Sequence, residues 1–130
     1  METALRIFAT KAFRRFQRKE NIDDSALRGA IERAESGLID ANLGGGLIKQ
    51  RVARSGEGRR GGLRTIIAYR SGGRAVFIFG FAKSRQANIG KADERDLRDY
   101  GALILDLDTA GIAKMIAGGE LKEVTGHGEK

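Results

Sequence analysis

The sequence predicts an α+β domain, in which an antiparallel sheet of about four strands is combined with an N-terminal helical hairpin and a C-terminal helix. Apolar residues recur at helical spacing in the first third of the chain, alternate with a period of two in the middle, and return to helical spacing after residue 90. Helices and strands that are segregated in this way are typical of α+β folds. We expect the helices on one side of the sheet and the other side free to bind.

The chain is predicted to form one domain. Its 130 residues, of which 41% are hydrophobic, suffice for one modest core. We expect this domain over residues 1–118 and a flexible tail over residues 119–130. No stretch of eighteen apolar residues and no secretory leader can be found, so a cytoplasmic protein without membrane contact is expected.

The N-terminal part is predicted to be a strand followed by two helices. Residues 4–9 have the composition of a short strand, and Thr10 can cap a helix over Lys11–Lys19. Asp23 or Asp24 can cap the second helix, which carries an apolar stripe. Alternating charged residues on the outer side of these helices are ordinary for amphipathic surface helices.

Three further strands are predicted over residues 48–53, Leu63–Arg70 and Arg74–Ala82. Residues 55–62 form a glycine-rich loop with two arginines, and residues 71–73 form a hairpin turn. The last strand is apolar on both faces and is therefore expected at the centre of the sheet. We assign its phenylalanines at 77, 79 and 81, together with Tyr69, to the core, although aromatics beside cations can also stack on RNA bases.

Helical spacing returns over residues 93–107 and again over residues 112–117, where two glycines follow. The chain from Lys122 onward is expected to be frayed.

Positive charge is concentrated in the middle of the chain. Residues 1–48 carry a net charge of +1, residues 49–85 carry +9, and residues 86–130 carry −3. Such a cationic block between near-neutral or acidic segments is expected of a surface that binds phosphates, because each cation placed against a nucleic-acid backbone releases counterions. The alternative is a solvated face that aids solubility, which would not require this segregation of charge.

Five cations of this block are predicted to converge. Lys49 and Arg51 are two residues apart on one strand, so both side chains leave the same face. Arg64 can join them if the next strand pairs across the glycine-rich loop. Lys83 and Arg85 directly follow the apolar strand and can reach the same patch.

This arrangement has a catalytic interpretation. Attack by a ribose 2′-hydroxyl on its adjacent phosphate builds negative charge on the phosphoryl oxygens, which fixed guanidinium groups stabilise. A lysine among other cations gives up its proton more readily, so Lys49 or Lys83 could act as general base or acid. Equally, the cations could serve as phosphate anchors without catalysis. We expect no cofactor and no metal ion, because the chain has no cysteine and its single histidine, His127, lies in the tail.

The segments K-x-R-V-A from Lys49, G-x-G-x-R-G-G-x-R ending at Arg64, and F-x-K-S around Lys83 resemble the HigB-like branch of the RelE/ParE superfamily of bacterial toxins. The resemblance extends from about Phe8 to Leu107. It implies a cytosolic toxin that enters the ribosomal A site, cleaves translated mRNA without metal, and is neutralised by a small helix-turn-helix antitoxin.

By this resemblance Lys49, Arg51 and Arg64 match the basic residues that contact the message, and Lys83 matches the basic residue after the last strand. We therefore predict these four as catalytic. Further arginines are expected to bind RNA: Arg54, Arg59, Arg60, Arg70 and Arg85.

The sequence departs from the family where a tyrosine often follows the lysine. Here Lys83 is followed by Ser-Arg-Gln-Ala-Asn-Ile-Gly, so the general acid stays open among Arg85, Lys83 and Tyr69. Two other functions also stay open: a ParE-like inhibitor of DNA gyrase, and an RNA-binding module without catalysis. The first of these classes lacks a convergent cationic site, which favours the nuclease here.

Overall fold

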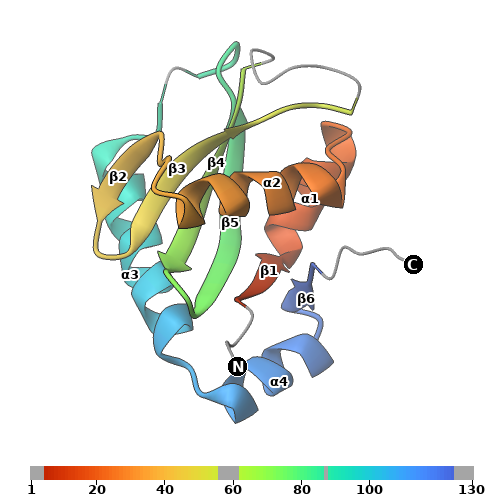
Figure 1. Cartoon of the computed structure of the whole chain (residues 1–130), viewed down its shortest axis with the longest axis vertical. Helices are drawn as coiled ribbons and strands as arrows, with labels where there is room; N and C mark the ends of the chain where they lie inside the picture. The colour runs from red at the N-terminus through yellow and green to blue at the C-terminus, as the bar shows by residue number, and fades with distance from the viewer. Residues whose placement is uncertain (1–4, 56–61, 87, 125–130) are drawn as a thin grey trace.

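The computed structural model describes residues 5–55, 62–86 and 88–124. The elements follow in the order β1 (Arg6–Thr10), α1 (Lys11–Lys19), α2 (Asp24–Glu35), β2 (Ala41–Gly44), β3 (Leu47–Val52), β4 (Leu63–Arg70), β5 (Arg74–Ala82), α3 (Lys91–Asp106), α4 (Thr109–Ala117) and β6 (Leu121–Glu123). Figure 1 shows helices α1 and α2 across one face of the sheet and α3 behind it. The α+β class is therefore confirmed.

The sheet differs from the expected four antiparallel strands. It has six strands in the order β2-β3-β4-β5-β1-β6, and it is mixed because β1 runs parallel to β5. The parallel pairing gives the N-terminal strand a partner that no hairpin could supply, and it makes β5 an interior strand as predicted. Strands β2 and β6 were missed because each is very short.

The predicted flexible tail is wrong for residues 121–124. Leu121–Glu123 pair with β1 as strand β6, and Leu121 and Val124 are buried in the two cores. Their apolar side chains and the open edge of β1 fix this segment. Residues 125–130 lie outside the described residues, together with His127.

The N-terminal helices follow the predicted capping. The Thr10 hydroxyl accepts a hydrogen bond from the amide of Phe13 at 3.1 Å, and Asp23 occupies the N-cap of α2 without a side-chain hydrogen bond. Phe16 of α1 lies so close to β5 that a Cβ at Gly80 would be 2.3 Å from its ring. Glycine at this position therefore lets α1 lie directly against the sheet.

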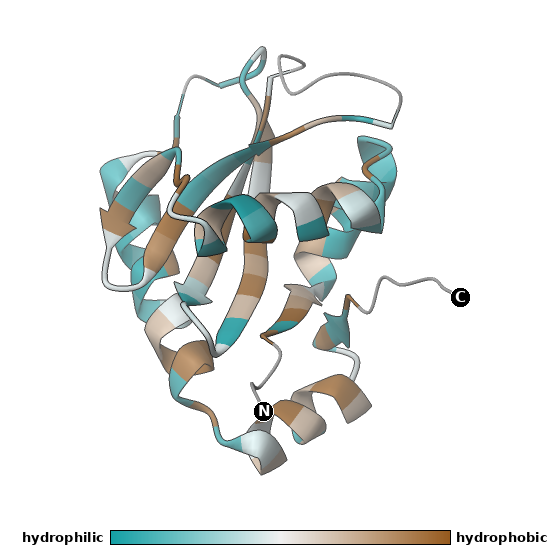
Figure 2. Ribbon diagram, in the orientation of Figure 1, coloured by the Kyte–Doolittle hydropathy of each residue, from teal (hydrophilic) through white to brown (hydrophobic). Residues whose placement is uncertain are grey.

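Helices cover both faces of the sheet, which corrects the expectation that one face is free. One core lies between the sheet and α1 and α2, and includes Phe13, Leu27 and Phe77. The second lies on the α3 side and includes Ile66 and Ile104. Helix α3 must cover this face because its own apolar stripe requires burial. Figure 2 shows hydrophobic residues along the middle strands and hydrophilic ones on the outer sides of α1 and α2.

Candidate active site

Two arginines face each other on neighbouring strands. Strands β3 and β4 pair antiparallel with Arg51 directly opposite Arg64 and Lys49 opposite Ile66. Directly opposed residues have Cβ atoms about 5 Å apart, and like charges at that spacing are destabilising. The structure therefore brings together three of the four cations predicted as catalytic, at a cost in folding free energy that calls for a functional explanation.

These cations lie on the α3 side of the sheet, beyond the part that α3 covers. The helix lies close to β4 at Gly101, where an added Cβ would be 3.1 Å from that of Ala68. Ile104 is fully buried next to this point. Toward the start of β4 the helix no longer covers the sheet, so Lys49 and Arg64 are half-buried and Arg51 is exposed. The result is an open, positively charged surface on a rigid sheet.

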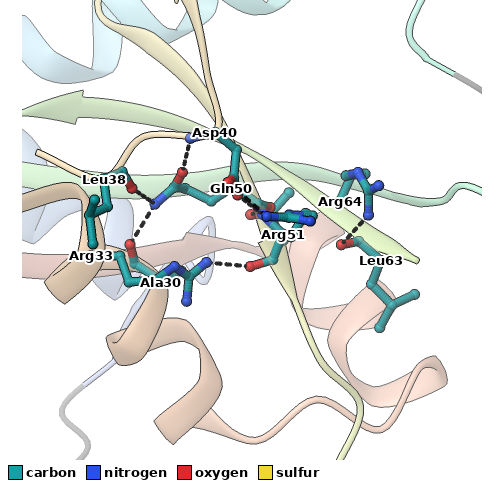
Figure 3. A network of polar contacts seen from close by, with 9 residues as sticks. Ala30, Arg33, Leu38, Asp40, Gln50, Arg51, Leu63 and Arg64 are labelled. Atoms are coloured by element: carbon teal, nitrogen blue, oxygen red, sulfur yellow. Dashed lines mark hydrogen bonds and ion pairs between the residues drawn. The ribbon is translucent and has the colours of Figure 1, made fainter. Parts of the chain in front are cut away.

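Arg51 is held on three sides. Its backbone amide donates to Asp40 Oδ2 at 2.7 Å, and its guanidinium donates to Asp40 Oδ1 at 3.4 Å. Its carbonyl accepts a 2.6 Å hydrogen bond from Arg33 of α2. Strand β2 ends before it reaches Arg51, so side chains here replace the missing strand partner (Figure 3).

Gln50 anchors this arrangement from beneath. Its side chain is fully buried, and its amide nitrogen donates to the carbonyls of Ala30 and Leu38. Its oxygen accepts from the backbone amide of Asp40 at 2.7 Å. Figure 3 shows Gln50 between helix α2 and the segment that carries Asp40, so one buried amide fixes the carboxylate that fixes Arg51.

Burial tends to raise the pKa of Asp40, but the hydrogen bonds from Arg51 and the charges of Arg51 and Arg33 outweigh it. The pKa of Asp40 is therefore lowered from its ordinary value. The carboxylate remains charged and continues to bind Arg51 at neutral pH.

Arg64 differs from Arg51 in having no acidic partner among the described residues. Its one side-chain hydrogen bond is a long contact of 3.5 Å to the carbonyl of Leu63. Its neighbour on β5 is Phe81, which is buried. A guanidinium that lies beside an apolar surface without a carboxylate partner is available for a phosphate.

The two predicted lysines come from the strands on either side of β4: Lys49 lies on β3, and Lys83 directly follows β5. Lys49 Nζ donates to Asn88 Oδ1 at 3.2 Å, so the segment after β5 reaches over β3. Lys83 is exposed, and its backbone amide donates to the carbonyl of Gly62, which extends the pairing of β4 and β5 by one residue beyond the start of β4. Sequence reasoning missed Asn88, because no pattern marks a single amide in a loop.

Arg54 and Arg85 have a different environment. Both bind Glu20, whose side chain is 4% exposed: Arg54 lies at 2.7 Å and Arg85 at 3.5 Å. Glu20 directly follows α1, while the arginines follow β3 and β5. This carboxylate therefore joins the ends of β3 and β5, the two strands that flank β4. Arg54 and Arg85, which were predicted to bind RNA, are thus also parts of a structural ion-pair cluster.

Arg70 lies far from the pair, at the other end of β4. It donates to the carbonyl of Leu105 at 2.9 Å and forms an exposed ion pair with Asp106. It lies six positions after Arg64, which corresponds to about 20 Å along a strand. The structure does not bring Arg70 to the site. Arg59 and Arg60, also predicted to bind RNA, lie outside the described residues.

The family model described as the RelE toxin of the RelE / RelB toxin-antitoxin system matches residues 5–124. The chain belongs to the RelE toxin family. This confirms the resemblance found in the sequence and implies a toxin role with a cognate antitoxin as partner. No curated protein sequence matches the chain. Its assignment to the HigB-like branch stays a prediction.

Two further findings describe this RelE-family toxin. Within residues 5–55, 62–86 and 88–124, no group of three histidine, cysteine, aspartate or glutamate side chains could hold a metal ion. None of the helices in the same part of the chain has the length and apolar character needed to cross a membrane.

Proposed function

We propose that this RelE-family toxin is an endoribonuclease that cleaves translated mRNA in the ribosomal A site without a metal ion and so inhibits translation. The observation that carries the proposal is the Arg51–Arg64 pair on the part of the sheet that α3 does not cover, with Lys49 beside it. A RelE-family toxin needs a way to damage its host cell, and a preorganised cation cluster suits a phosphodiester.

In the proposed reaction, the ribose 2′-hydroxyl oxygen forms a bond to the adjacent phosphorus while the bond from phosphorus to the 5′-oxygen breaks. The products are a 2′,3′-cyclic phosphate and a 5′-hydroxyl. A base removes the proton of the 2′-hydroxyl, and an acid supplies one to the leaving oxygen. No water, oxidant or metal enters this balance.

Arg64 is the proposed ligand of the phosphoryl oxygens, because no described carboxylate competes for its guanidinium. Arg51 supports it from the opposite strand in an orientation fixed by Asp40. Fixed charges of this kind stabilise charge that develops in the transition state without reorganising during the reaction.

Lys49 and Lys83 are the proposed proton-transfer groups, and they lie on either side of Arg64 in the strand order. Lys49 bonds only to a neutral amide among the described residues, that of Asn88. Arg85 remains a candidate acid, although Glu20 restrains it. Tyr69 is not a candidate, because it lies near the far end of β4 and donates to Glu35 there.

Primer extension on a defined mRNA in a purified translation system tests the proposal. We expect cuts in the presence of ribosomes that are lost with Arg64→Ala and kept with Arg70→Ala. The latter variant removes one arginine from the same strand, far from the site. A ribosome-free arm with EDTA separates contaminating metal-dependent nuclease from the toxin. The absence of cuts in every arm would overturn the nuclease proposal and lead to assays of gyrase inhibition and simple RNA binding.

A further inference from the structure

A second group of cations lies outside the candidate active site. Helix α1 carries Lys11, Arg14 and Arg18, and β6 contributes Lys122. They line two adjoining hollows of about 480 and 300 Å³, which share Arg14, Arg18 and Lys122. Lys11 lines the smaller of the two, and we call both hollows together the α1–β6 cleft.

The cleft carries an excess of positive charge. Lys11, Arg18 and Lys122 are exposed, and none of them forms an ion pair with a carboxylate among the described residues. Only Arg14 is paired, at 3.2 Å from Asp24. Three unpaired cations beside one arginine, whose charge Asp24 balances, create a positive electrostatic potential that attracts anions.

Hydrogen bonds hold the floor of the cleft in place. Arg14 is 19% exposed, and its guanidinium donates to Gln17 at 3.0 Å as well as to Asp24. Gln17 is itself buried, with its amide nitrogen bound to the carbonyl of Ile22 at 2.9 Å. A surface that only aids solubility needs no such buried support, so the arrangement resembles a built binding surface.

The cleft and the candidate active site lie on opposite faces of the sheet. Lys122 pairs with Ala9, a member of the core on the α1 side, so its side chain is directed to that side. Arg64 is directed to the other side, since it pairs with Phe81 of the second core. Figure 1 shows β6 beside α1 at the edge of the sheet that lies away from β3. The cleft and the candidate active site are therefore separate surfaces.

We propose that the α1–β6 cleft is a second nucleic-acid site that binds the phosphate backbone of an RNA segment distinct from the one that is cleaved. Lys11 and Arg18 are seven residues apart, or about 10 Å along the helix. This length exceeds a single phosphate and can be matched by successive phosphates of one nucleic-acid strand, each of which carries a negative charge. The choice of RNA as the polyanion rests on the proposed function.

The test is fluorescence anisotropy with a labelled RNA hairpin over a series of salt concentrations, with the full chain in an Arg64→Ala background. The cleft variant combines Lys11→Gln, Arg18→Gln and Lys122→Gln. The matched control combines Lys91→Gln, Arg95→Gln and Lys114→Gln, which removes the same charge from three exposed positions on α3 and α4. Circular dichroism checks that both variants fold.

We expect the cleft variant to lose at least about tenfold in RNA affinity at low salt, and its slope of log affinity against log salt to fall by about 2 to 3. The control should change much less. Equal losses in both variants would overturn the proposal, because they would reflect total charge alone, and so would no loss in either. A parallel titration with polyglutamate tests an acidic protein as the ligand instead. If the cleft variant lost affinity for polyglutamate while its RNA affinity stayed unchanged, the ligand of the cleft would be an acidic protein and the RNA proposal would be overturned.

This result is separable from the proposed function. The binding measurement requires no cleavage, and the primer-extension experiment leaves the cleft intact. If mRNA is never cut but the cleft variant still loses RNA affinity, the cleft stands while the nuclease proposal fails.

Discussion

The two ends of strand β4 carry the same residue type in opposite circumstances. At the C-terminal end of β4, Arg70 and the neighbouring Arg74 of β5 donate to carbonyls at the C-terminus of α3, where cations compensate the negative end of the helix dipole. At its start, Arg64 faces Arg51 and has no described carboxylate partner. One end uses its arginines for stability, and the other holds them together against repulsion. Charge alone therefore does not identify a site, whereas the partners of each charge do.

Reversing the charge of Arg64 tests this comparison most severely. Arg64→Glu places a carboxylate opposite Arg51, so the free energy of unfolding should rise by about 0.2–1 kcal/mol. Cleavage of ribosome-bound mRNA should fall by about 100- to 1000-fold, since a stabiliser of the transition state is lost. Urea unfolding and single-turnover kinetics measure the two quantities. A variant that is less stable and still active would contradict both the repulsion between Arg51 and Arg64 and the role of Arg64 in cleavage.

Gln50→Leu removes the support beneath Arg51. It leaves the carbonyls of Ala30 and Leu38 and the amide of Asp40 without their partner, so we expect a loss of about 2–3 kcal/mol in stability. Gln86→Leu, at an exposed glutamine with one hydrogen bond to a backbone carbonyl, is the control and should change stability little. If the two variants unfold at the same urea concentration, Gln50 does not anchor the site.

Arg70→Ala should affect only stability. The variant loses one hydrogen bond to the Leu105 carbonyl and an exposed ion pair with Asp106, which together correspond to about 1 kcal/mol. The cleavage rate per folded molecule should stay that of the unmodified chain. A large loss of cleavage at full folding would mean that the far end of β4 also contacts the message.

Asp40→Asn should produce the smallest effect, and one that depends on pH. The pKa of Asp40 is lowered in the folded state, so its contribution to stability is present above the unfolded pKa, about 4, and is lost as the pH falls through the folded value. We expect the variant to be less stable at neutral pH by up to about 1 kcal/mol, with the difference shrinking in acid.

Urea unfolding at several pH values measures this difference. Glu123→Gln is the control, because the pKa of Glu123 is also lowered, by its hydrogen bond with Arg6, far from the site. Only Asp40→Asn should also reduce cleavage. A stability difference that stays constant from neutral to acid pH would contradict a charged Asp40 that holds Arg51.

Most elements of the fold could be predicted from local patterns. Helices α1, α3 and α4 and strands β4 and β5 follow from periodicity and from the Thr10 cap. The parallel pairing of β1 with β5 could not be predicted, because it joins residues far apart in the chain. Strand β2 could not be predicted either, since it is only four residues long and its asparagine and glycine have low strand propensity.

The geometry of the candidate site was predictable where it depends on one hairpin. Alternation on a strand places Lys49 and Arg51 together, and antiparallel pairing adds Arg64. The roles of Arg70 and Arg54 could not be predicted, because each depends on where a helix end lies: the C-terminus of α3 for one, and Glu20 after α1 for the other. A basic block in a sequence therefore contains arginines that are available to a ligand and arginines that stabilise the fold, and the sequence alone does not distinguish them.

The central claim is that the Arg51–Arg64 pair stabilises the transition state of mRNA cleavage while Arg70 does not. The most direct measurement is the single-turnover cleavage rate on ribosomes programmed with a defined mRNA, at saturating toxin, for Arg64→Ala and Arg70→Ala beside the unmodified chain. We predict a loss of about 100-fold or more for Arg64→Ala and no loss for Arg70→Ala. Equal rates for the two variants would contradict the claim.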